Sequence, residues 1–154
     1  ARPDVHCIAH THTNAGMAVA CTQEGLRHDN FYSALLHNRI AYHDFEGITV
    51  MDDEKPRLIA NMGDKSLMIL RNHGLLACGR TIPEAFLNLW GMERACEVQV
   101  ATDSTGRPSI PVSDDILAKS EQLMAMQAMG GPAGELEFSA LTRLIEKIDP
   151  SYKD

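Results

Sequence analysis

Several features that define whole classes of protein are missing from this chain of 154 residues. No stretch approaches the ~18 consecutive apolar residues of a membrane-spanning helix, so we expect no membrane contact. The first residues lack the charged-then-apolar layout of a signal peptide. Lys and Arg number 14 against 21 Asp and Glu, a net charge of −7, and they form no basic stripe. Binding to a nucleic-acid backbone is therefore not expected.

Cysteine is sparse and shows no metal-binding spacing. Four cysteines are scattered along the chain, each with an apolar neighbour and none in a Cys-x-x-Cys pair: Cys7, Cys21, Cys78 and Cys96. Because cysteine is among the most often buried residue types, we expect four reduced core residues in a cytoplasmic protein.

The composition is that of an ordinary globular domain, with 44% hydrophobic and 23% charged residues. The patterns predict strands over residues 5–13, 40–45, 66–71 and 74–78, and helices over 15–23, 30–37, 58–63, 82–102, 113–129 and 135–148. Strands with interspersed helices, followed by helices alone, predict an α/β layered domain whose strand order stays open. The first strand carries small or apolar residues on both faces and is expected to be central.

Local signals mark several helix ends. Thr13 or Asn14 can cap the first helix. Thr81 and Glu84 have the spacing of a capping box. The chain begins without Met and reaches its first strand within five residues, so we expect it to be part of a longer polypeptide.

Three histidines form the most informative pattern. A strand sends alternate side chains to one face, so His10 and His12 leave the first strand together. His73 lies far along the chain, within Arg-Asn-His-Gly. Gly74 beside it allows a close backbone approach, and Asn72 tolerates a left-handed conformation. Three imidazoles with an open fourth position are the ligand set of a catalytic divalent transition metal.

The remaining polar residues have plainer interpretations. His6 lies four residues before His10, about 13 Å along an extended strand, so we expect it to be structural. We expect the residues of two further sets to be solvated: the histidines His28, His37 and His43, and the polar loop from Gly47 that contains Asp52, Asp53 and Glu54.

Five short blocks of this chain, taken in order, resemble the class II aldolase and adducin N-terminal family. That family includes the fuculose-phosphate aldolases. The resemblance covers about residues 1–100 and comprises Arg2-Pro3-Asp4, Ile8-Ala9-His10-Thr11-His12-Thr13, Leu70-Arg71-Asn72-His73-Gly74-Leu75, Glu84-Ala85-Phe86 and Glu93-Arg94-Ala95-Cys96.

This resemblance implies one domain over residues 1–154 that lacks its N-terminal part. The implied fold is a three-layer α/β/α sandwich with a central, mostly antiparallel sheet. Relatives form homotetramers with sites between subunits, so a homo-oligomer is expected. The family's ligands for Zn²⁺, or another divalent transition metal, map onto His10, His12 and His73. The family's catalytic carboxylate lies before the first strand, so its counterpart is expected upstream of Ala1. Tyr32 is a candidate proton donor; alternatively, its ring only packs against neighbouring residues.

The function implied is a zinc-dependent lyase acting on a hydroxylated carbonyl compound, phosphorylated or not, through a metal-stabilised enediolate. Epimerase, dehydratase and decarboxylase reactions use the same intermediate and stay open. A third alternative is an adducin-like, non-catalytic oligomerising head, although this acidic chain lacks a basic tail.

Overall fold

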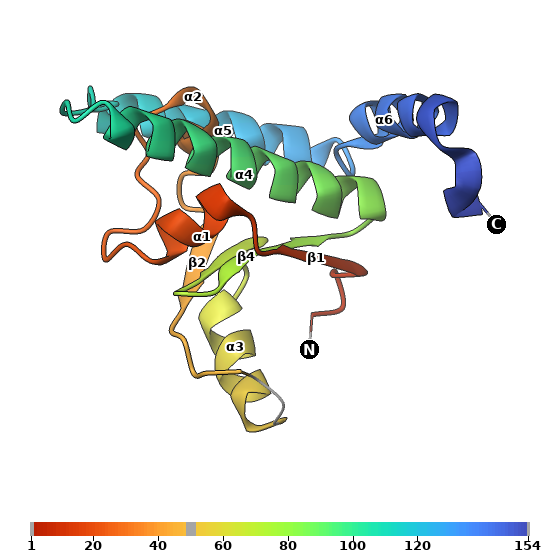
Figure 1. Ribbon diagram of the computed structural model, residues 1–154, viewed down its shortest axis with the longest axis horizontal. Coiled ribbons are helices and arrows are strands. Elements are labelled where there is room, and N and C mark those ends of the chain that lie inside the picture. The colour runs from red at the N-terminus through yellow and green to blue at the C-terminus, as the bar shows by residue number, and fades with distance from the viewer. Residues whose placement is uncertain (1, 49–51, 154) are drawn as a thin grey trace.

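The structure, a computed structural model, describes residues 2–48 and 52–153 (Figure 1). Four strands form one mixed sheet in the order β1-β4-β3-β2: β1 (Cys7–Thr11), β2 (Ile40–His43), β3 (Leu67–Leu70) and β4 (Gly74–Gly79). β4 runs antiparallel to both β1 and β3, whereas β2 runs parallel to β3. The expected α/β class and mostly antiparallel sheet are confirmed.

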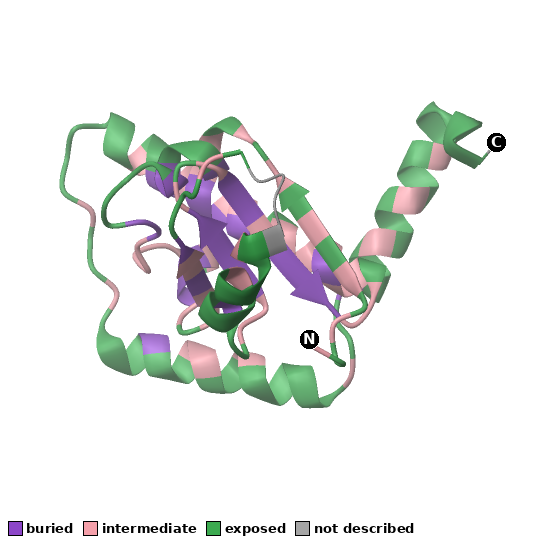
Figure 2. Cartoon of the chain, turned by 90° about the horizontal axis from the view of Figure 1, so that it is seen from below, coloured by how far each residue is buried: buried purple, intermediate pink, exposed green. Residues whose placement is uncertain are grey.

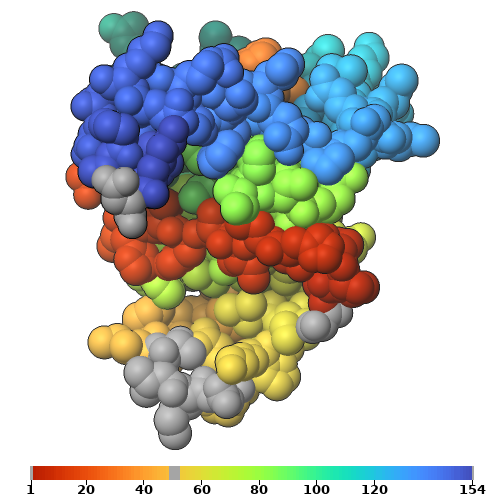
Figure 3. Space-filling view, turned by 90° about the vertical axis from the view of Figure 1, so that its right-hand side faces the viewer, coloured from red at the N-terminus to blue at the C-terminus, as the bar shows by residue number. Residues whose placement is uncertain are grey.

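Helices cover both faces of this sheet. α1 (Asn14–Ala20) and α4 (Ile82–Ser104) pack on one face, and α3 (Lys55–Met62) packs beside β2 on the other. The remaining helices are α2 (Phe31–Ala34), α5 (Asp114–Met129), α6 (Glu135–Ile148) and the 3-10 turns η1 (Asp52–Glu54) and η2 (Pro150–Lys153). In the space-filling view the C-terminal helices lie above the strand β1, and α3 lies below it (Figure 3).

The strand β3 divides the core in two. Leu67 and Ile69 belong to a cluster with residues of α1 and α4, while Met68 and Leu70 belong to a second cluster with Met62 of α3. All four strand residues are buried (Figure 2). Because a strand sends alternate side chains to opposite faces, full burial requires a helix layer on each side. The sandwich follows from this pattern.

The expected helix caps are present. The Thr13 hydroxyl accepts from the Gly16 N–H and caps α1. At α4, the Thr81 hydroxyl accepts from the Glu84 N–H, as the capping box predicts. The reciprocal half of the predicted capping box is not formed, because the Glu84 carboxylate accepts from the N–H of Arg80, one residue before the cap, at 2.6 Å.

The expected central position of the first strand is wrong for the described residues. β1 pairs only with β4 and forms an edge of the described sheet. Its residues Cys7, Ala9 and Thr11 are half-buried, but Ile8 on the opposite face is 64% exposed. Small or apolar side chains on both faces of the strand suggested that both faces are buried. In the structure only the face with Cys7, Ala9 and Thr11 is partly buried.

The expected polar loop after Gly47 is also corrected. Asp52–Glu54 form the turn η1, and the next helix begins at Lys55, three residues earlier than predicted, with Pro56 in its first turn. Residues 49–51 of that predicted loop lie outside the described residues. A proline at a helix start needs no hydrogen-bond partner for its nitrogen, which explains the early start.

Only half of the expected core cysteines are buried. Cys78 and Cys96 lie in the core, Cys7 is half-exposed and Cys21 is exposed at the end of α1. All four are free thiols. No described helix combines the length and apolar character needed to cross a membrane.

Candidate metal centre

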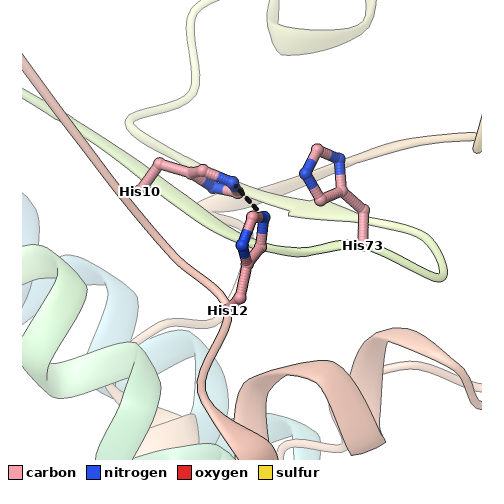
Figure 4. Close-up of side chains that lie close together, drawn as sticks. All are labelled: His10, His12 and His73. Carbon is pink, nitrogen blue, oxygen red and sulfur yellow. Dashed lines mark hydrogen bonds between the residues drawn. The ribbon is translucent and has the colours of Figure 1, made fainter. Parts of the chain in front are cut away.

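Three imidazole rings from two distant stretches of the chain meet at the end of β1. His10 lies in β1, His12 lies just beyond its last residue, and His73 lies in the turn between β3 and β4 (Figure 4). One ring nitrogen from each lies within 4.8 Å of the other two. The ring centroids are 4.5, 4.9 and 4.8 Å apart. We call these three residues the histidine trio.

The hydrogen bonds of His10 define its tautomer. Its Nδ1 lies 2.7 Å from the carbonyl oxygen of Leu75, so Nδ1 carries the proton and donates it. The lone pair of His10 is then on Nε2, which lies 2.8 Å from Nε2 of His12. A backbone carbonyl that fixes the remote nitrogen of an imidazole is the usual support of a metal-ligating histidine.

His73 is presented by a tight turn. Asn72 has a φ of 56°, the left-handed conformation expected for it, and its N–H donates to the Ala20 carbonyl at 3.0 Å. Burial lowers the pKa of the His73 imidazole, and the nearby rings of His10 and His12 lower the pKa further. A depressed pKa favours the neutral ring, which is the form that binds a metal.

Gly74 makes the convergence sterically possible. A Cβ at this position would lie 2.3 Å from the backbone oxygen of Thr11, 3.1 Å from a ring carbon of His12 and 3.3 Å from one of His10. The expected close backbone approach is therefore observed. Any larger residue would push the turn that carries His73 away from the end of β1.

A cavity of about 260 Å³ opens beside the trio, with His10 and His73 in its lining. The same cavity is lined by His43 and Glu54. His43 is 3% exposed, so its expected surface position is wrong. Its Nε2 lies 3.0 Å from a Glu54 oxygen, and its Nδ1 lies 2.8 Å from the Asn61 amide nitrogen.

Glu54 is not the solvated residue that the sequence predicted, because its side chain is only 13% exposed. A sequence signal for this pair existed: Ala41 and His43 alternate along β2 and share its buried face. A buried imidazole needs a polar partner, and the segment between β2 and α3 contains several carboxylates, Glu54 among them.

The other predicted residues lie apart from the trio. His6 is exposed, and His28 and His37 are half-buried with ring centroids 5.0 Å apart rather than solvated. Tyr32 packs against Trp90 at 5.8 Å and lines a separate cavity of about 510 Å³ between α2, α4 and α5. A role for Tyr32 in a neighbouring subunit's site stays a prediction.

The donor set of the trio fits a divalent transition metal. Three imidazole nitrogens on a partly exposed surface are ligands that suit zinc, copper, iron or nickel and leave a position open for substrate. The carbonyl that orients His10 and the space that Gly74 leaves both support that arrangement.

The fold and this site define a class of protein. The model of the class II aldolase and adducin N-terminal domain matches residues 1–100, and the chain belongs to that family.

Individual relatives fall into two groups. The chain is 40% identical to a Pseudomonas aeruginosa protein provisionally named as an aldolase class 2 protein, over 99% of this chain and 60% of the relative. It is also 40% identical to alpha-adducin of Rattus norvegicus, over 96% of this chain but only 22% of that protein. The chain thus spans about 60% of the bacterial relative's length.

Solved structures agree with this assignment. An aldolase II superfamily protein from Pseudomonas syringae superimposes with a TM-score of 0.91 at 38% identity, covering 99% of this chain and 61% of that one. An L-fuculose 1-phosphate aldolase from Glaciozyma antarctica superimposes with a TM-score of 0.76 at 26% identity. The match covers 97% of this chain and 55% of the aldolase.

Proposed function

We propose that this protein is a zinc-dependent lyase that cleaves or forms a carbon–carbon bond in a hydroxylated carbonyl compound, phosphorylated or not. The observation that carries the proposal is the convergence of His10, His12 and His73 within 4.8 Å. A bound divalent cation supplies Lewis-acid stabilisation of the negative charge that develops on adjacent substrate oxygens when such a bond breaks.

The chain's own residues hold the site ready for that chemistry. The Leu75 carbonyl keeps His10 in the tautomer with a free Nε2, and burial lowers the pKa of the His73 imidazole, which favours its neutral form. The three ligands come from a strand end and a tight turn, which are rigid supports. A preorganised site loses little free energy to rearrangement when substrate binds.

The assembly expected from the family is part of the proposal. We infer a cytoplasmic homotetramer with its sites between subunits. In that arrangement Tyr32 of one subunit would serve as a proton donor at a neighbouring site, and the general base would come from residues upstream of Ala1.

A single substitution in the full-length protein tests the metal site. His73→Ala removes one of three ligands, so bound zinc is expected to fall from near-stoichiometric to a small fraction, with loss of retro-aldol turnover. Zinc is measured by elemental analysis, and turnover on a panel of sugar phosphates and hydroxy acids. His6→Ala is the matched control, because His6 is exposed and lies outside the trio. Unchanged zinc content in His73→Ala would refute the assignment.

Two alternatives remain within the same family. An epimerase, dehydratase or decarboxylase would use the same three ligands, and product analysis across the substrate panel separates these reactions from cleavage. An adducin-like, non-catalytic head is favoured by the 40% identity to alpha-adducin. Co-sedimentation with actin and spectrin, together with absence of bound metal, would support that alternative.

A further inference from the structure

A second cavity, of about 510 Å³, lies between α2, α4 and α5 and shares no lining residue with the histidine trio. Its lining is mostly apolar and contains three aromatic side chains, Phe31, Tyr32 and Trp90. The ring centroid of Tyr32 lies 5.5 Å from that of Phe31 and 5.8 Å from that of Trp90, in edge-to-face geometry. Apolar cavities of this size are typical binding sites for small organic molecules, and aromatic walls favour an aromatic ligand.

Arg39 brings a positive charge to the wall of this cavity. Its Nη2 donates to Oδ1 of Asn88 at 2.9 Å, and among the described residues no carboxylate forms an ion pair with its guanidinium. Burial lowers the pKa of Arg39, and the charge of Glu84 offsets part of that effect. A guanidinium that is partly removed from water and has a neutral partner is stabilised when an anion joins it.

Asn88 fixes the direction of this guanidinium. The amide nitrogen of Asn88 donates to the carbonyl oxygen of Cys78 in β4 at 3.0 Å, so its amide oxygen faces Arg39. A guanidinium has several N–H donors in one plane, and the bond to Asn88 uses one of them. The remaining donors suit the two oxygens of a carboxylate, which pair with a guanidinium in the same plane.

Two carboxylates also line the cavity, and each is held by a partner of its own. Glu84 accepts from the backbone N–H of Arg80 at 2.6 Å and from its Nη2 at 2.8 Å, so Arg80 offsets its charge. Glu121 accepts from the Asn38 amide at 2.8 Å and forms no ion pair with Arg39. The described wall thus offers one guanidinium without a carboxylate partner, which matches a ligand with a single anionic group.

We propose that this cavity is a binding site for a small monocarboxylate with an aromatic body. The carboxylate pairs with Arg39, and the body lies among the apolar and aromatic side chains of α2, α4 and α5. Neither contact needs a metal ion or the histidine trio, so this site goes beyond the proposed lyase function and does not depend on it.

A purely structural role for Arg39 predicts a different result. Its bond to Asn88 joins the segment before β2 to α4. If that is its whole role, removing the guanidinium lowers stability, and the cavity does not distinguish a carboxylate from the corresponding neutral amide.

Three probes separate these roles: 4-phenylbutyrate, its neutral amide 4-phenylbutanamide, and acetate, which has the charge without the aromatic body. Isothermal titration calorimetry on the full-length protein measures their dissociation constants. We expect the value for 4-phenylbutyrate to be roughly tenfold lower than those for the amide and for acetate, because partial burial strengthens a charge-assisted pair. Equal dissociation constants, or no saturable binding of 4-phenylbutyrate, would overturn the proposal.

The same titrations without zinc separate this site from the histidine trio, because a bound zinc ion also attracts carboxylates. The preference for 4-phenylbutyrate is expected to be the same in the zinc-loaded protein and after chelation. A preference that disappears with the zinc would place the ligand at the trio and refute the second site. Failure of the lyase proposal would appear as absence of bound zinc and would leave this result unchanged.

Substitution of Arg39 assigns the preference to this residue. In Arg39→Met the dissociation constants of 4-phenylbutyrate and its amide should agree within about twofold, since the charge-assisted pair is lost. Arg107→Met is the matched control, because it removes the same charge from an exposed residue outside the cavity lining. A preference retained in Arg39→Met would refute the role of Arg39.

Filling the cavity tests its location without changing Arg39. Gly91 in α4 lines the cavity, and a Cβ at this position meets no atom within 4 Å. The side chain in Gly91→Leu therefore has room to occupy the cavity, and both aromatic probes should bind roughly tenfold more weakly. Unchanged affinity in Gly91→Leu would show that the probes bind elsewhere. If Arg39→Met does not fold, this variant and the wild-type ratios decide.

Discussion

At the scale of single residues, the histidine trio depends on a residue that has no side chain. Gly74 begins β4 directly after His73, and the backbone oxygen of Thr11 occupies the space where a Cβ would lie. The glycine is therefore a steric requirement of the site. Gly74 is needed because the backbones of β1 and β4 approach closely there, and not for a left-handed conformation, since its φ is not positive.

Substitution of this glycine should damage stability and metal binding together. In Gly74→Ala the Cβ would lie 2.3 Å from the Thr11 oxygen, which forces the β1–β4 contact apart. We expect a loss of about 1–3 kcal/mol in the free energy of unfolding. We also expect at least a tenfold loss of zinc affinity, because the His73 turn moves away from β1. Denaturant unfolding and zinc titration measure the two effects.

Gly91→Ala is the control for that experiment. A Cβ at Gly91 in α4 meets no atom within 4 Å. There the substitution should stabilise the protein by about 0.5–1 kcal/mol, because alanine favours a helix interior. Equal effects at the two glycines would contradict the steric account.

At the scale of elements, two long helices begin in different ways. α4 begins at Thr81, whose hydroxyl accepts from the Glu84 N–H at 3.2 Å. α5 begins at Ser113, whose side chain makes no capping hydrogen bond. Serine and threonine are both favoured at the N-cap position, so the sequence does not distinguish the two helix starts. The structure shows that the Thr81 side chain caps its helix and that the Ser113 side chain does not.

This difference predicts unequal costs for the same kind of substitution. Thr81→Ala should cost about 1 kcal/mol of unfolding free energy, since an N–H at the start of α4 loses its partner. Ser113→Ala should cost less than about 0.5 kcal/mol, as expected for a surface substitution. Urea unfolding midpoints measure both changes. A cost at Ser113 equal to that at Thr81 would show that α5 is also capped in solution.

At the scale of the whole molecule, burial is very uneven. β3, β4 and the adjoining face of α4 contain most of the fully buried side chains. α6 contains no buried residue and projects from the body of the molecule (Figure 2). Its apolar residues, such as Leu136 at 84% and Ile148 at 70%, are exposed.

Hydrogen exchange should follow this distribution. Amides of β3 and β4 are expected to exchange only through global unfolding, whereas amides of α6 exchange through local opening at much lower free energy. Exchange followed by mass spectrometry over seconds to hours resolves the two regimes. Protection of α6 equal to that of β3 would contradict the expectation and would mean that its apolar face is covered in solution.

The features that the sequence alone determined are local ones, such as strand alternation, turns and helix caps. The alternation of a strand aligns His10 with His12, the bend at Asn72 and Gly74 presents His73, and helix starts at Thr13 and Thr81 follow from capping chemistry. The last helix, Glu135–Ile148, also has its predicted bounds. Each of these depends on neighbours within a few residues, so short-range patterns contain the information.

Tertiary structure alone decided which surfaces are covered and which distant residues meet. His43 and Glu54 are eleven residues apart and were both expected in solvent, yet they form a buried pair beside the trio. Strand β1, with apolar residues on both faces, lies at an edge of the described sheet. The physical reason is that burial depends on how whole elements pack, and residue types limit that packing without specifying it.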